Sequence, residues 1–169
     1  VGSELIATEL TVLRDAILTL AGSLDSTIGG APVQKDQQDT STRRSLYFVH
    51  SGLQRNPFLT VFDEATVEEC YRRAQSIVPQ QALALSNSAL VLDASKKIAK
   101  QISETSTSDT AFIKKSFSTV LCNQVDETEL QLSHDALATW REIPEATEDS
   151  VRAHFIWALL NHNDFVTLR

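Results

Sequence analysis

The amino-acid sequence predicts an all-α, mostly helical single domain: a bundle of about six helices with one or two short extended segments. Three observations favour this fold class. Apolar residues recur at steps of three and four along most of the chain, helix-capping patterns precede several of these stretches, and only two short runs have strand-like composition. With 169 residues, 42% of them hydrophobic, the chain is long enough to bury one core, so we expect one domain over 1–169.

The first helix is expected from Ser3, as its N-cap, to about Leu24. Its apolar positions are Ile6, Leu10, Leu13, Ile17, Leu20 and Leu24. Residues 25–44 then form a long polar connection that the glycines and proline of GGAP at 29–32 keep irregular. Since 34–42 is almost without apolar side chains, we predict a mobile, loosely ordered loop over about 25–44.

The run SLYFV at 45–49 is aromatic and β-branched, so we expect a short extended segment there. A lone strand is not stable by itself. It must dock on helices or pair with another extended run, for example FVTL at 165–168.

Two helices are expected in the middle of the chain. Thr66 to Glu69 is a capping box that predicts a helix from Val67 to about Ala74, and Pro79 is suited to begin a second helix over about 80–102. The weakly helical run 86–88 predicts a kink in it. Its expected buried side consists of Leu83, Val91, Ala94, Ile98 and Ile102.

Three more helices follow. The apolar spacing between Phe112 and Leu121 predicts a helix with one buried face. A capping-box-like start at Asp126 predicts a second helix to about Glu142, and Pro144 ends it. The last helix is expected over about 148–161, with the tail returning in extended form. The core positions expected on the last two helices are Leu130, Leu137, Trp140, Val151, Phe155, Ala158 and Leu159.

The charge balance excludes some classes of partner. A net charge of −7 argues against nucleic-acid binding and against a polybasic membrane patch. No apolar run approaches the roughly 20 residues that a membrane span requires. The chain contains no methionine and begins Val-Gly-Ser, so we expect a piece of a larger multidomain protein or a processed product.

The stretch 56–87 concentrates polar side chains that need partners among apolar ones that favour burial. We expect a binding or bracing hub there, with further members from outside the stretch: Arg44, Asp63, Arg72, Arg73, Gln81, Asn87, Asn161 and Asn163. The simpler interpretation is bracing, with the arginines paired to Asp63 or to carbonyl groups. The alternative is a binding site in which Arg73 clamps an anionic group.

Motifs for catalysis or metal binding are absent from the sequence. The four histidines lack close ligand spacing, and the run from Asn161 to Asp164 is better explained as a helix stop than as a metal cluster. Neither a nucleophile elbow nor a phosphate loop is present. Cys70 and Cys122 could pair as a disulfide in an oxidising compartment or remain two buried thiols.

A series of ordered motifs resembles a known family. The motifs are LRDAIL at 13–18, GGAP at 29–32, RRSLY at 43–47, NPFL at 56–59, FD at 62–63, Cys70, Arg72-Arg73, VPQQALALSN at 78–87, the acidic start at 126–130 and WALLNHNDFV at 157–166. In this order they resemble the C-terminal domain of unknown function (DUF1553-like) of large planctomycete-type, cytochrome c-associated surface proteins. The matching positions are Arg44, Asp63, Cys70, Arg73, Gln81, Asn87, Asn161, Asn163 and Phe165. Cys122-Asn123 stands where the resemblance leads us to expect an arginine.

The resemblance implies context rather than mechanism. Such parent proteins are exported to the periplasm or cell surface and carry c-type haem upstream, whereas no haem or other cofactor is expected in this chain. We therefore expect a structural or interaction module without its own catalysis, whose partners are other domains of the same parent. One alternative is a site for acidic or sulfated carbohydrate, with Arg73, Asp63 and Asn163 near one pocket. Another is docking to the upstream haem domain.

Overall fold

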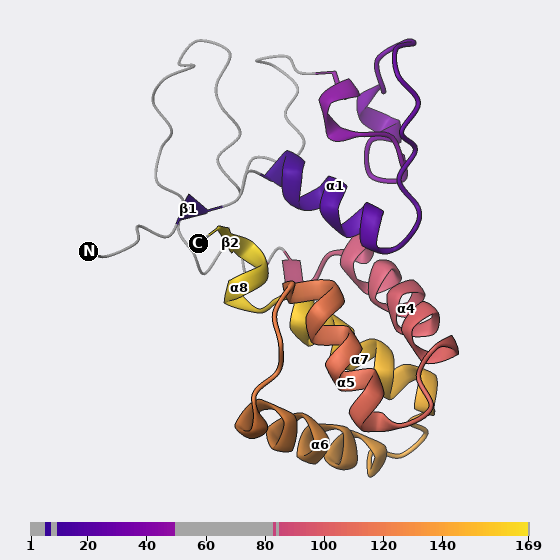
Figure 1. Ribbon diagram of the computed structural model, residues 1–169. Coiled ribbons are helices and arrows are strands. Elements are labelled where there is room, and N and C mark those ends of the chain that lie inside the picture. Colours follow the sequence, from indigo (N-terminus) through magenta and orange to yellow (C-terminus); the bar gives the residue numbers. More distant parts are fainter. Residues whose placement is uncertain (1–5, 8–9, 50–82, 84, 169) are drawn as a thin grey trace, which may run out of the picture.

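The computed structural model describes residues 6–7, 10–49, 83 and 85–168, and the all-α prediction is confirmed for this part of the chain (Figure 1). In chain order the elements are β1 (Ile6–Ala7), α1 (Leu10–Leu20), 3-10 turns at Lys35–Gln37 and Ser45–Tyr47, α4 (Ala89–Glu104), α5 (Asp109–Ser116), a π-helical turn at Phe117–Leu121, α6 (Glu127–Arg141), α7 (Glu148–Leu160), α8 (Asn163–Val166) and β2 (Thr167–Leu168). The helices expected at 67–74 and at the start of 80–102 lie in residues outside this description.

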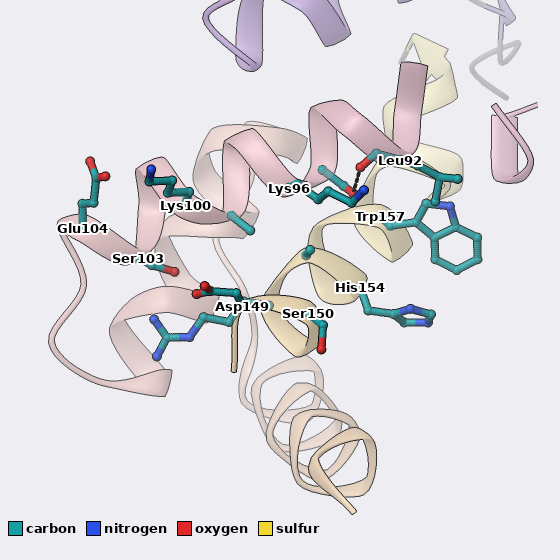
Figure 2. A pocket seen from close by; sticks show the side chains of 13 residues that line it. Leu92, Lys96, Lys100, Ser103, Glu104, Asp149, Ser150, His154 and Trp157 are labelled. Atoms are coloured by element: carbon teal, nitrogen blue, oxygen red, sulfur yellow. Dashed lines mark hydrogen bonds between the residues drawn. The ribbon is translucent and has the colours of Figure 1, made fainter. Parts of the chain in front are cut away.

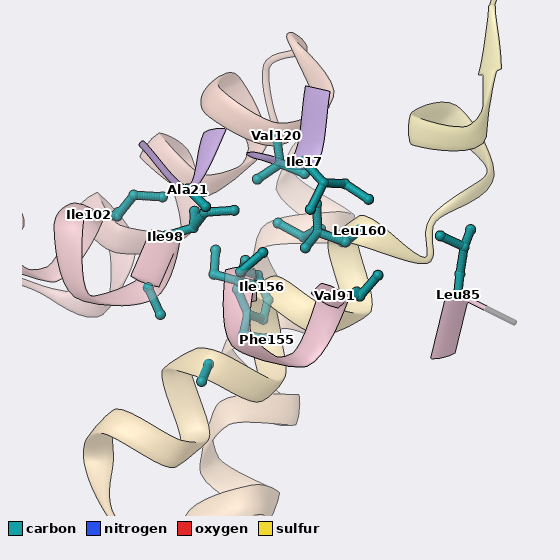
Figure 3. Packing of buried hydrophobic residues seen from close by; sticks show 14 of the residues in the cluster. Ile17, Ala21, Leu85, Val91, Ile98, Ile102, Val120, Phe155, Ile156 and Leu160 are labelled. Atoms are coloured by element: carbon teal, nitrogen blue, oxygen red, sulfur yellow. The ribbon is translucent and has the colours of Figure 1, made fainter. Parts of the chain in front are cut away.

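The core is built on α4 and α7, which form the most extensive helix pair among the described elements. Helix α5, the π-helical turn and α6 pack on this pair, and α1 lies against α4 (Figure 1). Figure 3 shows Ile17 of α1 and Ala21, just after its end, meeting residues of α4 and α7 in one buried cluster. The largest fully buried side chains include Phe112, Leu13, Ile17, Leu85, Ile98, Ile113, Leu137, Ile156, Leu160 and Val91.

The expected faces of the later helices are largely confirmed. Phe112, Phe117, Val120, Leu137 and Phe155 are buried, and Leu130 and Trp140 pack on the core from its edge. One expected core position is wrong: Leu83 is 64% exposed, whereas Leu85 is 1% exposed. The helical stretch before α4 breaks at 87–88, as the predicted kink requires, and α4 begins anew at Ala89. The apolar repeat of α4 therefore does not continue back through 87–88, so it assigns the wrong side to residues before the break.

The N-terminal expectations need two corrections. Helix α1 begins at Leu10, because Ile6–Ala7 is extended and pairs with Thr167–Leu168 in an antiparallel ribbon. The segment 45–49 does not pair with the C-terminal run: its first part is a 3-10 turn, and Phe48 forms an isolated bridge with Val33. The C-terminal tail itself is extended only after α8. Both corrections arise from backbone pairing with residues distant in the sequence, 167–168 for the first segment and Val33 for the second.

The end of α1 is fixed by Gly22, which adopts the left-handed conformation at φ 62°. Its N–H donates to the carbonyl of Thr19, and the next N–H, of Ser23, donates to that of Leu18. Glycine suits this position because a side chain would be strained there. A Cβ would also lie 3.1 Å from the Gln101 amide nitrogen, so α1 and α4 approach closely at this point.

The capping box expected at Asp126 is confirmed. The Asp126 carboxylate accepts from the Glu129 N–H at 2.7 Å, and the Glu129 carboxylate accepts from the Asp126 N–H at 2.9 Å. We expect Asp126→Ala to lower the free energy of unfolding by about 1 kcal/mol, because the Glu129 N–H at the helix start loses its acceptor. Urea unfolding measures this. Asp126→Asn should retain most of the stability, because an asparagine side chain also accepts from the N3 backbone N–H. Equal destabilisation by both variants would contradict the capping role.

No helix among the described residues combines the length and apolar character needed to cross a bilayer.

Candidate functional site

A buried arginine fastens the connection after α1. Arg14 is only 4% exposed, and its guanidinium lies over the Phe48 ring at 4.6 Å. It donates to the carbonyl of Arg43 at 2.9 Å, to the Ser45 hydroxyl at 3.2 Å and to the carbonyl of Ser41. Burial lowers the pKa of Arg14, while the nearby carboxylates raise it in part. Main-chain and hydroxyl oxygens therefore take the place of water around the buried guanidinium.

Asp15 continues this cluster. Its carboxylate accepts from the Ser45 N–H and from the Ser45 hydroxyl, both at 2.9 Å, and lies 3.4 Å from Nε of Arg44. Ser45 is completely buried. The motifs at 13–18 and 43–47 are thus brought together by hydrogen bonds from α1 to the backbone at 41–45, with Arg44 at the exposed edge.

A second arginine holds the GGAP turn. Arg43 donates to the carbonyl oxygens of Ala31, at 3.0 Å, and of Gly29, and its guanidinium lies 4.2 Å from the centre of the Tyr47 ring. The Tyr47 hydroxyl in turn accepts from the Gly29 N–H at 3.0 Å. These contacts give the expected loose loop over 25–44 a defined, irregular path; its mobility stays a prediction.

Half of the expected hub lies outside the described residues, namely Asp63, Arg72, Arg73 and Gln81. The described candidates make local contacts with the backbone. The Asn87 amide donates to the carbonyl of Leu83 at 2.9 Å, and the Asn161 amide donates to that of Trp157 at 2.8 Å. Asn163 begins α8 and is exposed. These contacts are of the bracing kind, but the roles of the candidates stay predictions.

Two further expectations concern cysteine and metal. Cys122 is exposed, contrary to the buried-thiol alternative for this residue; its pairing with Cys70 stays a prediction, since Cys70 is not described. The run from Asn161 to Asp164 ends α7, as expected, with Asn161 at the C-cap. Among the described residues, no three acidic, histidine or cysteine side chains are placed to hold one metal ion.

Sequence reasoning missed a charged quartet that joins three helices. Arg141, at the end of α6, lies 2.8 Å from Asp109, at the start of α5, and 2.7 Å from Glu148, at the start of α7. Arg152 lies 2.8 Å from Glu148 and 3.4 Å from Asp109. Hydrogen bonds from Arg141 are the main cause that lowers the pKa of both carboxylates. Both acids also stand at helix N-termini, where negative charge is favoured.

The quartet predicts a stability that depends on pH. A carboxylate whose pKa is lowered by folding stabilises the native state above its unfolded pKa, and this contribution is lost as pH falls through the folded value. We expect Arg141→Gln to cost about 1 kcal/mol near neutral pH, because these pairs are partly exposed. The difference from the unmodified chain should shrink as pH falls below about 4.5, the ordinary pKa of glutamate.

Urea unfolding at a series of pH values measures this effect. Lys96→Gln is the matched control, since its 3.5 Å pair with Asp93 is 71% exposed on both sides and should contribute almost nothing. A cost of Arg141→Gln that stays constant down to strongly acidic pH would contradict the coupling between the quartet and stability.

An open groove of about 800 Å³ runs between α4 and α7 (Figure 2). The α4 wall contributes Leu92, Ser95, Lys96, Ala99, Lys100, Ser103 and Glu104, and the α7 wall contributes Asp149, Ser150, Arg152, Ala153, His154 and Trp157. Leu92 is 42% exposed although it is apolar. Glu104 lies at one end of the groove and Lys96, His154 and Trp157 lie toward the other, with Lys100 and Asp149 between.

A row of three rings borders the groove. His154 lies 4.8 Å from the Trp140 ring and 5.0 Å from the Trp157 ring, measured between centroids. The Trp157 indole N–H donates to the carbonyl of Ser86 at 3.1 Å, which fixes this ring at the edge of the groove. His154 also lines a smaller hollow of about 270 Å³, together with Trp140 and Pro144. His154 therefore contributes to both hollows.

Comparison with protein families decides the relationship. The family model PSD1, described as a protein of unknown function (DUF1553), matches residues 6–137. The chain belongs to the DUF1553 family. No curated protein and no solved structure matches the DUF1553 chain. The family match confirms the resemblance drawn from the sequence motifs, while the planctomycete and cytochrome context remains an expectation.

The family match covers one wall of the groove of the DUF1553 chain and not the other. The α4 wall lies within residues 6–137, and so do the Arg14 and Arg43 clusters. The α7 wall, with Trp157, follows the matched region. Chemically, the arginine clusters hold the chain's own backbone, whereas the groove presents an apolar floor and charged edges to solvent.

Proposed function

We propose that this DUF1553 chain is a structural and interaction module of a larger exported protein, without catalysis of its own, and that the α4–α7 groove receives another domain of the same parent. The observation that carries the proposal is the groove itself. Its apolar lining, with the exposed Leu92 and the half-buried Trp157 at the edge, resembles the anchors of protein interfaces, where tryptophan is enriched. A periplasmic or cell-surface location and a haem-carrying neighbour belong to the same proposal.

The use of arginine in the described residues supports a module of this kind. Arg14 and Arg43 hold carbonyl groups within the chain, and Arg141 and Arg152 pair with Asp109 and Glu148. Their hydrogen-bonding capacity is therefore largely committed to internal contacts. What faces solvent in the groove is apolar surface edged with lysine and acidic side chains. Such a surface suits association more than the binding and turnover of a small polar substrate.

The proposal is tested by the thermal stability of the module inside the full-length protein. A docked partner stabilises the folded module by mass action, so the module should unfold at a higher temperature in the full-length protein than alone. Ser103→Phe would fill the groove from a half-exposed position and should abolish this difference without changing the isolated chain. Lys115→Glu, on α5 and outside the groove, is the control. Equal unfolding temperatures in both settings would contradict docking.

The ring row favours a second candidate function, the binding of acidic or sulfated carbohydrate. Trp157 and His154 form an edge of two neighbouring rings, and Lys96 and Lys100 stand on the opposite wall as cations for sulfate or carboxylate groups. Calorimetric titration with a sulfated oligosaccharide tests this. Binding should weaken at least about tenfold in Trp157→Ala and in Lys100→Glu, since one supplies the ring and the other the charge. Absence of heat at millimolar ligand would exclude it.

A further inference from the structure

We propose that the occupant of the α4–α7 groove is an amphipathic helix of about three turns, antiparallel to α4, with basic residues in its first turn and acidic residues in its last. This inference rests on the proposed function and names the chemistry of the partner. The shape of the groove, the bonding of its polar groups and the distribution of its charges each support it.

The shape of the groove suits a third helix. Ser95 and Ala99 of α4 and Ala153 of α7 are small and nearly buried, so the floor between the two helices is low. A third helix can lie 8–10 Å from its neighbours only where side chains at the contact are small. The α4 wall runs from Leu92 to Glu104, which corresponds to about 18 Å at 1.5 Å per residue. A helix of about 12 residues matches that length.

Several polar groups in the groove already have hydrogen-bond partners within the chain. The Ser95 hydroxyl donates to the carbonyl of Leu92 at 2.8 Å, and the Ser150 hydroxyl donates to that of Thr147 at 2.7 Å. The Arg152 guanidinium is held by Glu148 and Asp109. Burying these groups under apolar side chains leaves their hydrogen bonds intact, so the desolvation cost is small. A sugar, which depends on hydrogen bonds, would find these groups already engaged.

The charges differ between the two ends of the groove. Glu104 makes one end acidic and Lys96 lies toward the other, with Lys100 and Asp149 between them (Figure 2). A helix placed with its N-terminus at the acidic end satisfies both ends, since its macrodipole is positive there. The Lys96 pair with Asp93 is highly exposed on both sides and is weak enough to yield to a new partner. Charge complementarity therefore sets the orientation.

The test uses two designed peptides and the chain as it stands. Both peptides have about 14 residues, a stapled helical backbone and one Ala/Leu face. The matched peptide carries lysines in its first turn and glutamates in its last; the exchanged peptide has these charges reversed. Affinity is followed by the tryptophan fluorescence of the chain and by calorimetry.

We expect the matched peptide to bind at least about tenfold more tightly than the exchanged one, a difference typical of a few complementary charges at an interface. The Lys96→Glu, Lys100→Glu double variant should reduce or reverse this preference, and Ser103→Phe should abolish binding of both peptides. The Lys114→Glu, Lys115→Glu double variant, with the same charge change on α5, should behave like the unmodified chain.

Other results of these measurements would overturn the helix, its orientation or docking within the parent. No saturable binding of either peptide overturns the helix as occupant, and equal affinities overturn its orientation. A dimer in light scattering that Ser103→Phe dissociates would make a second copy of the chain the occupant instead. If the full-length protein stabilises the module but the peptides do not bind, docking stands and the helix fails. If the peptides bind without that stabilisation, the helix stands and docking within the parent fails.

Discussion

Replacing Arg14 with methionine is expected to lower the free energy of unfolding by about 3 kcal/mol, measured by urea denaturation. Methionine preserves much of the packing volume but removes every hydrogen bond of the buried guanidinium. The carbonyl groups of Ser41 and Arg43 would then be left without their partner, and Asp15 would lose a nearby cation. An unpaired buried acceptor costs about 1–3 kcal/mol, which makes this one of the most damaging substitutions in the chain.

Arg44→Met is the matched control for Arg14→Met. The Arg44 side chain is 51% exposed, and its ion pair within the described residues is with Asp15 at 3.4 Å, so its loss should cost at most about 0.5 kcal/mol. The two substitutions remove the same charge from neighbouring parts of one cluster. Comparable effects of both variants would show that net charge, rather than the hydrogen bonds of a buried cation, determines the stability of this region.

Phe112→Ala is expected to destabilise the chain by about 3–5 kcal/mol, the usual range for deleting a buried aromatic ring. Phe112 is completely buried, its ring lies 5.9 Å from that of Phe155, and the Arg152 guanidinium lies 4.9 Å above it. Deletion would open a cavity where α5 meets α7 and remove the apolar support beneath the charged quartet. The measurement is again the urea midpoint and slope.

Two controls separate this cavity effect from a general loss of hydrophobicity. Phe112→Leu keeps most of the volume and should cost about 1–1.5 kcal/mol. Leu132→Ala removes an apolar side chain that is 64% exposed and should cost less than about 0.5 kcal/mol. A loss for Phe112→Ala no greater than that for Leu132→Ala would contradict the position of Phe112 in the core.

The helices from α4 onward could be predicted because their signals are local. The apolar face of α4 repeats without interruption from Val91 to Ile102, and the capping box at Asp126 involves residues three apart. Both depend on side chains within one or two turns, where helical geometry alone sets the neighbours. Their positions in the structure therefore agree closely with those expected from periodicity.

The N-terminal region could not be predicted in the same way. Ile6 continues the apolar repeat of α1, yet its backbone pairs with Leu168 at the opposite end of the chain. Arg14 lies within the apolar motif LRDAIL, and nothing local indicates that its cation is buried against the backbone at 41–45. The contacts that fasten the segment 25–44 come from partners distant in the sequence, which no local pattern indicates.

The candidate site was predictable only in part, because a groove is a property of two helices together. Trp157 and Lys96 are 61 residues apart, by subtraction of their sequence numbers, and only the packing of α4 on α7 brings them to one surface. The charged quartet has the same origin, since Asp109 and Arg152 are separated by 43 residues. Sequence reasoning placed its candidates in the middle of the chain, where charged residues are dense but the structure describes few of them.

The most direct test of the docking surface is the reactivity of its lysines. Brief acetylation followed by mass spectrometry would compare Lys96 and Lys100 in the isolated chain and in the full-length protein, with Lys114 and Lys115 of α5 as internal references. We predict that Lys96 and Lys100 become several-fold less reactive in the full-length protein, because a docked partner covers them, while the α5 lysines keep their reactivity. Equal reactivity of all four lysines in both settings would contradict docking at the groove.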